Sequence, residues 1–231
     1  MRQLSLGMLL QDRAVFASFL SGGNALALAA AQALAAGNTN SSGDALLYLH
    51  GVGGTGKSHL LQAFCAAVPG AGYFPLAQLR ELGADVLEGL AGLPAVAIDD
   101  LQAVAGDADW ERQLFGLYND CLARGTRLLV AARAPAVEAG FSLPDLRSRL
   151  AAMPHFALRP LDETQQRAAL QLRAAQRGIE LPDETLLYLQ RRFARDMTRL
   201  HDLLDRLDLA SLREQRRLTV PFIREVLGET D

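Results

Sequence analysis

The stretch that decides the fold is Gly51-Val-Gly-Gly-Thr-Gly56-Lys57-Ser58, which fits the phosphate-binding pattern G-x-x-x-x-G-K-[ST]. Glycines let the backbone curl so that several N–H groups point at phosphate oxygens. A helix that begins near Lys57 adds the positive end of its dipole at the same place. In this pattern the lysine reaches the β- and γ-phosphates, and the serine hydroxyl is a Mg²⁺ ligand. The sequence therefore predicts a site for ATP or ADP with Mg²⁺.

The lysine of this motif is also unusual in the composition. Of the 23 basic residues 22 are arginine, and Lys57 is the one lysine. A lysine ammonium is compact, whereas an arginine guanidinium is planar and larger. In a chain that otherwise uses arginine for its basic residues, a lysine at this position indicates that the site requires the compact group. His59 lies just past the loop. It could contact phosphate, or it could be an ordinary exposed histidine on the helix. We predict that the nucleotide is bound by Gly51, Gly53, Gly54, Thr55, Gly56, Lys57, Ser58 and His59.

An acidic pair supplies the second half of the predicted site. The apolar run Ala95–Ile98 reads as a buried strand, and Asp99 and Asp100 follow it directly. A carboxylate at the end of such a strand lies beside the phosphate-binding loop and near its Mg²⁺. We assign Asp99 to the metal, through water, and Asp100 to orienting or deprotonating the attacking water. The alternative is that the two acids only terminate the strand.

Alternating elements around these motifs predict an α/β fold. Apolar strands are expected at Ala45–His50, Gly72–Phe74, Ala95–Ile98, Arg127–Ala132 and His155–Leu158, with helices at Lys57–Val68, Leu76–Leu90, Trp110–Leu122 and Leu143–Ala152. Unbroken apolar strands indicate a parallel sheet sandwiched by helices. After Pro160 only helical spacing remains, at Glu163–Arg177, Asp183–Phe193, Met197–Leu212 and Thr219–Leu227. We therefore divide the chain into a nucleotide-binding α/β domain at 11–160 and an all-α domain at 161–231.

Composition excludes several other classes of protein. The chain has 231 residues, a net charge of −3 and an isoelectric point near 5.8, so it has no basic footprint for nucleic acid. Two cysteines make no disulfide framework, and no His/Cys spacing suits zinc. The longest apolar run, Ala25–Ala36, is short of the ~20 residues that span a bilayer, and no signal peptide is evident. We expect a cytoplasmic protein without membrane contact.

The combined motifs resemble the AAA+ P-loop ATPases, whose α/β domain is followed by an all-α lid. Within them the chain resembles the DnaA-related branch and its Hda family of regulators, which inactivate the replication initiator DnaA. The residues that carry this resemblance are GVGGTGKSHLLQA (51–63), VAIDDLQAVAGDADWE (96–111), LPDLRSRL (143–150), RDMTRLHDLLDRLDLAS (195–211) and RRLTVPFIREVL (216–227). DnaA carries a further DNA-binding domain after its lid, which this chain has no room for, so the Hda family is the expectation.

The resemblance implies functions for two further parts of the chain, a clamp-binding N-terminal peptide at residues 1–10 and Arg149 in the α/β domain. Residues 1–10 are similar to the peptide with which Hda docks on the DNA-loaded sliding clamp, through Gln3, Leu4, Leu6 and Met8; a frayed terminus is the alternative reading. Arg149 matches the family's arginine finger, which stabilises charge on the phosphoryl group of a neighbour's nucleotide. The implied function is negative regulation of replication initiation, with DnaA and the clamp as partners and DNA met only indirectly. A homodimer remains open.

Three departures from the family pattern imply weak intrinsic ATP hydrolysis. The polar sensor-1 position, at the end of the predicted strand Arg127–Ala132, reads Ala131-Ala132. Thr198 occupies the place of the sensor-2 arginine, for which Arg195 or Arg199 is the candidate replacement. Asp100 stands where many AAA+ enzymes have glutamate. These features suit a protein that keeps nucleotide, such as ADP, as a structural ligand. The alternatives are an autonomous ATPase, such as a DnaA-like factor, helicase or clamp loader, and a small-molecule P-loop kinase.

Overall fold

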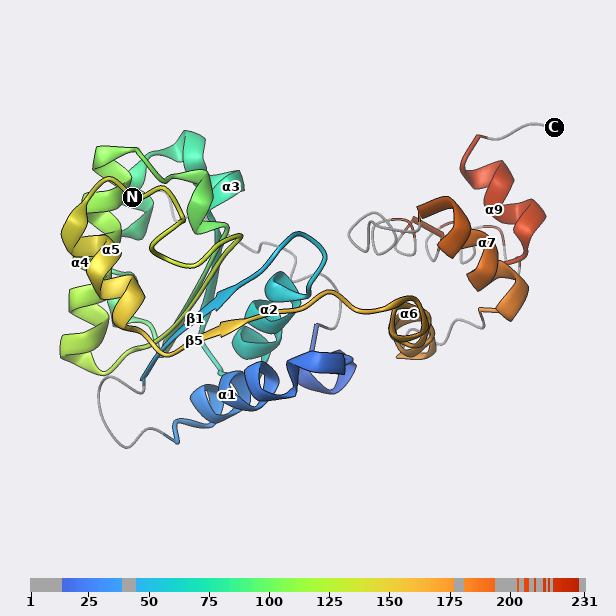
Figure 1. Cartoon of the computed structure of the whole chain (residues 1–231), viewed down its shortest axis with the longest axis horizontal. Coiled ribbons are helices and arrows are strands. Elements are labelled where there is room, and N and C mark those ends of the chain that lie inside the picture. The colour runs from blue at the N-terminus through green and yellow to red at the C-terminus, as the bar shows by residue number, and fades with distance from the viewer. Residues whose placement is uncertain are drawn as a thin grey trace. The chain divides into compact units, whose positions relative to one another are not determined.

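The computed structural model describes residues 14–38, 45–176, 181–193 and 218–228, together with residues 203, 206, 207, 210, 214 and 216. The chain divides into two compact units: the first comprises Met1–Val52 and Gly56–Arg159, and the second comprises Pro160–Asp231 together with the short loop segment Gly53–Thr55. Figure 1 draws the first unit from blue to yellow and the second from orange to red.

The first unit is built on a five-stranded sheet in which all strands run parallel. Its strands are β1 (Leu46–His50), β2 (Gly72–Pro75), β3 (Ala95–Asp99), β4 (Arg127–Ala132) and β5 (His155–Ala157). They lie in the order β2-β3-β4-β1-β5, with Leu49 opposite Ala131 and Ile98 opposite Val130. Every residue of β3 is buried, as both faces of the sheet are covered. The predicted α/β fold, a parallel sheet between helices, is confirmed.

Alternate strand residues enter two cores on opposite faces of the sheet. On one face Leu47, Leu49 and Leu129 pack with α1 (Ala25–Ala36) and α2 (Lys57–Ala67). On the other face Tyr48 and Ile98 pack with α3 (Leu76–Leu79), α4 (Ala108–Arg124) and α5 (Pro144–Ala152). Figure 1 shows the two helical layers on either side of the strands. The side-chain period of two along a strand produces this division.

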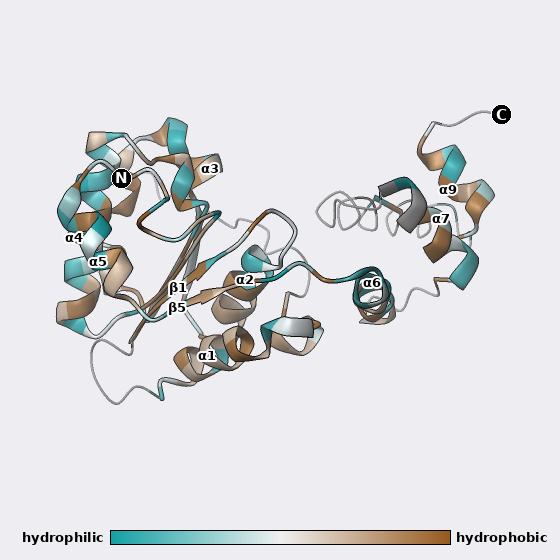
Figure 2. Ribbon diagram, viewed as in Figure 1, coloured by the Kyte–Doolittle hydropathy of each residue, from teal (hydrophilic) through white to brown (hydrophobic). Residues whose placement is uncertain are grey.

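Helix α1 was not anticipated from the sequence. Its twelve residues carry no charge, and Figure 2 draws most of them in the tan and brown of apolar residues. The helix ends at Gly37, which adopts a left-handed φ of 72°. Ala27, Ala31 and Leu34 are buried, whereas Leu26 is 76% exposed. Among the described residues, no helix is long and apolar enough to cross a membrane.

The segment after β2 also differs from the expected one or two helices over Leu76–Leu90. Only α3 is α-helical, and three short 3₁₀ turns follow at Arg80–Leu82 (η4), Ala84–Leu87 (η5) and Leu90–Gly92 (η6). Gly83 and Gly89 have φ values of 87° and 75°, which a continuous helix does not allow. Further 3₁₀ turns are η1 (Phe16–Ser18), η2 (Gly22–Asn24) and η7 (Leu101–Ala103).

The second unit is helical where it is described. It contains α6 (Glu163–Gln176), α7 (Asp183–Phe193) and α9 (Val220–Val226), around a core of Leu170, Leu186, Leu189, Leu203, Leu207, Leu218, Phe222 and Ile223. The buried Thr185 hydroxyl donates a 2.9 Å hydrogen bond to the carbonyl of Leu218. The guanidinium of Arg216 lies 4.4 Å from the Phe222 ring centroid. Most of the helix expected at Met197–Leu212 lies outside the described residues.

Candidate nucleotide site

The phosphate-binding loop joins β1 to α2. Gly54 and Gly56 have φ values of 77° and 91°, which side chains rarely adopt, and Gly56 is the residue that precedes α2. Lys57 is 8% exposed, and its ammonium donates hydrogen bonds of 2.6 Å and 2.8 Å to the carbonyls of Gly51 and Val52. The loop is therefore curled around its own lysine, with the N-terminal end of α2 behind it.

Burial and nearby carboxylates act in opposite directions on Lys57. Desolvation is the larger effect and lowers the pKa of its ammonium, while the charges of Asp99 and Asp100 raise it. The two acids thus lie near enough to Lys57 to interact with it electrostatically. This brings the second predicted motif to the phosphate-binding loop, as the parallel strand order requires.

Asp99 is a buried carboxylate at the end of β3. It is 1% exposed, its Oδ2 accepts a 2.9 Å hydrogen bond from the Tyr73 hydroxyl, and its Oδ1 accepts one of 2.8 Å from the N–H of Asp100. Desolvation raises the pKa of Asp99, although hydrogen bonds from Ser58 and Tyr73 counteract it. Ser58 and Asp99, the two predicted Mg²⁺ ligands, therefore lie together, and their oxygens suit this hard cation.

Asp100 is held by a short network that sequence reasoning missed. It is the one non-glycine residue with positive φ (56°) among the described residues. Its Oδ1 accepts a 2.8 Å hydrogen bond from Nε2 of Gln102, and Oε1 of Gln102 accepts one of 3.1 Å from the N–H of Arg133. Gln102 thus links Asp100 to the end of β4, where Ala131 and Ala132 leave no polar side chain. An amide two residues after the acids was the available signal.

The segment before α1 packs on the phosphate-binding loop. An added Cβ at Gly56 would lie 2.6 Å from Cε2 of Phe19, so the Phe19 ring covers this glycine closely. His59 lies within 3.0 Å of the Ser18 hydroxyl and 3.1 Å of the Val15 carbonyl, measured from Nε2. Its ring is also 5.6 Å from that of Phe19, centroid to centroid. These three contacts join His59 to the segment of residues 15–19.

The same segment is fixed to the end of the first unit. The side chain of Asn24 is buried and pairs with the backbone of Arg159 in both directions. Its Nδ2 donates a 2.9 Å hydrogen bond to the Arg159 carbonyl, and its Oδ1 accepts one of 2.7 Å from the Arg159 N–H. These two bonds hold the start of α1 beside the chain that leaves β5.

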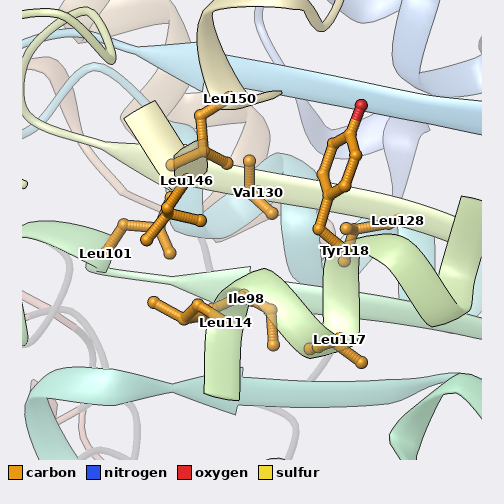
Figure 3. A pocket seen from close by; sticks show the side chains of 9 residues that line it. All are labelled: Ile98, Leu101, Leu114, Leu117, Tyr118, Leu128, Val130, Leu146 and Leu150. Atoms are coloured by element: carbon orange, nitrogen blue, oxygen red, sulfur yellow. The ribbon is translucent and has the colours of Figure 1, made fainter. Parts of the chain in front are cut away.

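Arg149 lies on α5, which packs on α4 and covers the face of the sheet opposite to α2. Its side chain is exposed, with the guanidinium carbon 6.0 Å from the Tyr118 ring centroid. Leu146 and Leu150 on the same helix are buried against α4. The apolar side chains that meet here, from η7, β3, β4, α4 and α5, line a cavity of about 10 Å³ (Figure 3). That volume is close to one water and too small for a ligand.

Several predicted residues fall outside the described residues. They are the clamp-binding set Gln3, Leu4, Leu6 and Met8, and the sensor-2 candidates Arg195 and Arg199, with Thr198 between them. Among the residues that are described, no group of three or more His, Cys, Asp or Glu forms a metal cluster.

Comparison with known proteins places this site in a familiar fold. Residues 162–227 match the model of the Hda lid domain. Domain III of DnaA from Thermotoga maritima superimposes with a TM-score of 0.76 at 22% identity, covering 94% of this chain and 96% of that one. AMPPCP-bound DnaA from Aquifex aeolicus gives a TM-score of 0.61 at 21% identity over 78% of this chain and 61% of that one.

More distant AAA+ proteins share the fold as well. The Orc1 protein of Aeropyrum pernix gives a TM-score of 0.64 at 16% identity, covering 86% of this chain and 63% of that one. The sheet order, the phosphate-binding loop with its acidic pair and the match to the Hda lid domain agree with one another. Residues 162–227 therefore match an Hda-type lid domain, and the chain as a whole has the AAA+ fold of DnaA domain III.

Proposed function

We propose that this chain binds ADP or ATP with Mg²⁺ at the loop of residues 51–58. The loop presents backbone N–H groups at the start of α2, and Lys57 is held at its centre by two carbonyls that phosphate oxygens would replace. Ser58 and Asp99 would hold the Mg²⁺, and the cation would offset the cost of the buried Asp99 charge. The AMPPCP bound to similar DnaA structures supports this proposal.

We propose further that the nucleotide-bound chain stimulates ATP hydrolysis by DnaA. The observation that carries this is the Hda lid match, combined with an exposed Arg149 on a helix anchored to α4. A guanidinium that enters a partner's site stabilises negative charge on the transferred phosphoryl group, an effect of about 10³–10⁵ in rate. Residues 1–10 would dock on the DNA-loaded sliding clamp and so bring the chain to DnaA. The outcome is negative regulation of replication initiation.

Weak hydrolysis by the chain itself fits the same proposal. Ala131 and Ala132 are fully buried at the end of β4 and offer no side chain to a water near the γ-phosphate. Asp100, the candidate base, has one carboxylate oxygen occupied by Gln102. A resident nucleotide would then act as a ligand that stabilises the folded state by linkage.

The test is single-turnover hydrolysis of ATP preloaded on DnaA, with sliding clamp, DNA and this chain in its ADP form. We expect clamp-dependent acceleration that Arg149→Ala removes and Arg147→Ala preserves. Arg147 is the matched control because it is also exposed on α5, two residues away. Full acceleration by the Arg149→Ala protein would overturn the mechanism. Replacement of Gln3 and Leu6 by alanine should abolish the additional acceleration that the clamp produces.

An autonomous ATPase is the second candidate, because such an enzyme would bind its nucleotide and Mg²⁺ with the same residues, Lys57, Ser58 and Asp99. Steady-state phosphate release by the chain alone, with and without single-stranded DNA, separates the two. Turnover of several per minute, unaffected by DnaA, would favour the autonomous enzyme over the regulator.

A further inference from the structure

Glu111 is a buried carboxylate that the proposed mechanism does not use. It lies in the first turn of α4 and is 1% exposed. Its Oε1 accepts hydrogen bonds of 2.7 Å from the N–H of Gly106 and 2.9 Å from that of Ser142, and its Oε2 accepts one of 2.6 Å from that of Leu143. A buried charge costs several kcal/mol unless it is compensated, so this carboxylate has a specific structural task.

Backbone groups provide the compensation. Three N–H donors meet the two oxygens, and hydrogen bonds to an ionised acceptor are about twice as strong as neutral ones. The carboxylate also lies at the positive ends of two helices, the first turn of its own α4 and the residue before α5. Glu111 thereby connects three pieces of chain: the turn at Gly106, the start of α4 and the entry to α5.

The beginning of α5 depends on this connection. Its preceding residue is Leu143, whose side chain provides no cap, and its first residue is Pro144, which has no N–H. Residues 133–143 form a long connection from β4 to this helix. The two hydrogen bonds that Glu111 accepts from the N–H groups of Ser142 and Leu143 therefore anchor the end of the connection and fix where α5 begins.

Arg149 is carried by the helix that Glu111 anchors. Leu146 and Leu150 hold the buried side of α5 on α4, beside Leu114. Tyr118, seven residues after Glu111 and on the same face of α4, lies under the Arg149 guanidinium. One face of α4 thus contacts α5 at its start, along its apolar side and at the arginine.

We propose that Glu111 is a positioning residue for Arg149, which fixes the start of α5 so that the guanidinium meets a partner's bound nucleotide in one defined geometry. This inference rests on the proposed function of Arg149. A stabilised transition state is sensitive to misplacement of about 1 Å, so a loosened α5 should reduce the rate at saturation more than it reduces binding.

The variant that tests this is Glu111→Gln. Its amide oxygen can still accept from Gly106 and Ser142, but its NH₂ faces the N–H of Leu143, so the contact with α5 is lost first. In the free chain we expect faster amide hydrogen exchange within residues 143–152, with β3 and β4 still protected. In the DnaA assay we expect the maximal rate to fall by about tenfold or more. The half-saturating concentration and the affinity for ADP should change by less than about threefold.

A merely structural role gives a different pattern. Partial unfolding removes active protein, and therefore lowers ADP binding capacity and β3–β4 protection together with the rate. If the Glu111→Gln variant folds poorly, Glu111→Asp is the second test. Aspartate keeps the charge, but its side chain is one methylene too short to reach α5. It should show the same faster amide hydrogen exchange within residues 143–152. Arg147→Ala is the control for α5 itself and should behave as the unmodified chain does.

Two outcomes would be decisive against the inference. If Arg149→Ala retains full stimulation, the proposed function itself fails. If Arg149→Ala loses stimulation while Glu111→Gln has raised exchange in α5 and an unchanged maximal rate, Arg149 acts without the anchor and the positioning role of Glu111 is wrong.

Discussion

The hydroxyl of Tyr73 on β2 donates a 2.9 Å hydrogen bond to Oδ2 of Asp99 at the end of β3. The two strands are adjacent and in register at Tyr73 and Ala97, so the tyrosine reaches the carboxylate across the sheet edge. The bond lowers the pKa of Asp99, but desolvation is larger and the net shift is upward. The free chain therefore carries a carboxylate whose charge is unfavourable without a cation.

Replacing Asp99 by asparagine should stabilise the nucleotide-free chain at pH 7. Because its folded pKa is raised, Asp99 contributes stability that is present below its ordinary pKa of about 4 and lost as the pH rises through the folded value. The gain of Asp99→Asn should therefore be present at pH 7 and vanish near pH 4, where the carboxyl group is protonated in both states. Denaturant unfolding at several pH values measures it. Tyr73→Phe is the opposite control, and lower stability of Asp99→Asn at pH 7 contradicts the argument.

The hydrogen bond between Asp100 and Gln102 should persist when the carboxylate and the amide are swapped between the two positions. Gln102→Glu places two carboxylates together, so stability should fall as the pH rises above about 5. Adding Asp100→Asn should restore it, because the asparagine amide then donates to the new glutamate, whose other oxygen still accepts from Arg133. Thermal unfolding from pH 4 to 8 tests both proteins. A double variant no more stable than Gln102→Glu would mean that the network contributes nothing.

Gly56→Ala should damage the loop more than Gly53→Ala does. At Gly56 the φ of +91° costs alanine roughly 1–2 kcal/mol, and its Cβ would lie 2.6 Å from Phe19. At Gly53 nothing lies within 4 Å of an added Cβ. We expect Phe19→Ala to recover only the steric part of the Gly56→Ala loss, because the backbone strain remains. The measurement compares the stability and ADP affinity of Gly56→Ala, Gly53→Ala, Phe19→Ala and the double variant Phe19→Ala/Gly56→Ala. Equal losses at both glycines would count against this argument.

Leu146→Ala should be among the costly substitutions of the first unit. Leu146 is fully buried and already borders the small cavity between α4, α5 and the sheet, so truncation enlarges an existing void. We expect a loss of about 2–5 kcal/mol in unfolding free energy. The control is Leu26→Ala on α1, which is 76% exposed and should change stability by less than about 0.5 kcal/mol. Similar values for both would refute the packing argument.

Strongly periodic or uniformly apolar segments were predictable from the sequence. Strand β4 has the predicted bounds at Arg127–Ala132, and α2 begins at Lys57 as predicted. Helix α1 was missed because an uncharged, alanine-rich segment has almost no polar face to reveal a helical period. The segment after β2 was misjudged because its apolar spacing suggests a helix, whereas Gly83 and Gly89 adopt positive φ values that interrupt one.

The site was predictable only where chemistry follows from local spacing. The loop around Lys57 and the acid pair Asp99-Asp100 are contiguous motifs, so their residue types alone suggest phosphate and metal. Gln102 and Glu111 act on backbone groups 31 and 32 residues away, at Arg133 and Leu143. Such partners appear in no local pattern, because only the parallel crossover connections bring them together.

The strand order has a consequence for how the chain is made. Strand β1 lies between β4 and β5, and none of its neighbours in the sheet precedes it in the sequence. It ends at His50, while β4 begins at Arg127. At ~5–20 residues per second the ribosome needs several seconds to supply that partner. Throughout that interval the nascent chain exposes an apolar strand with both edges free, which is when chaperones would have the greatest effect on its yield.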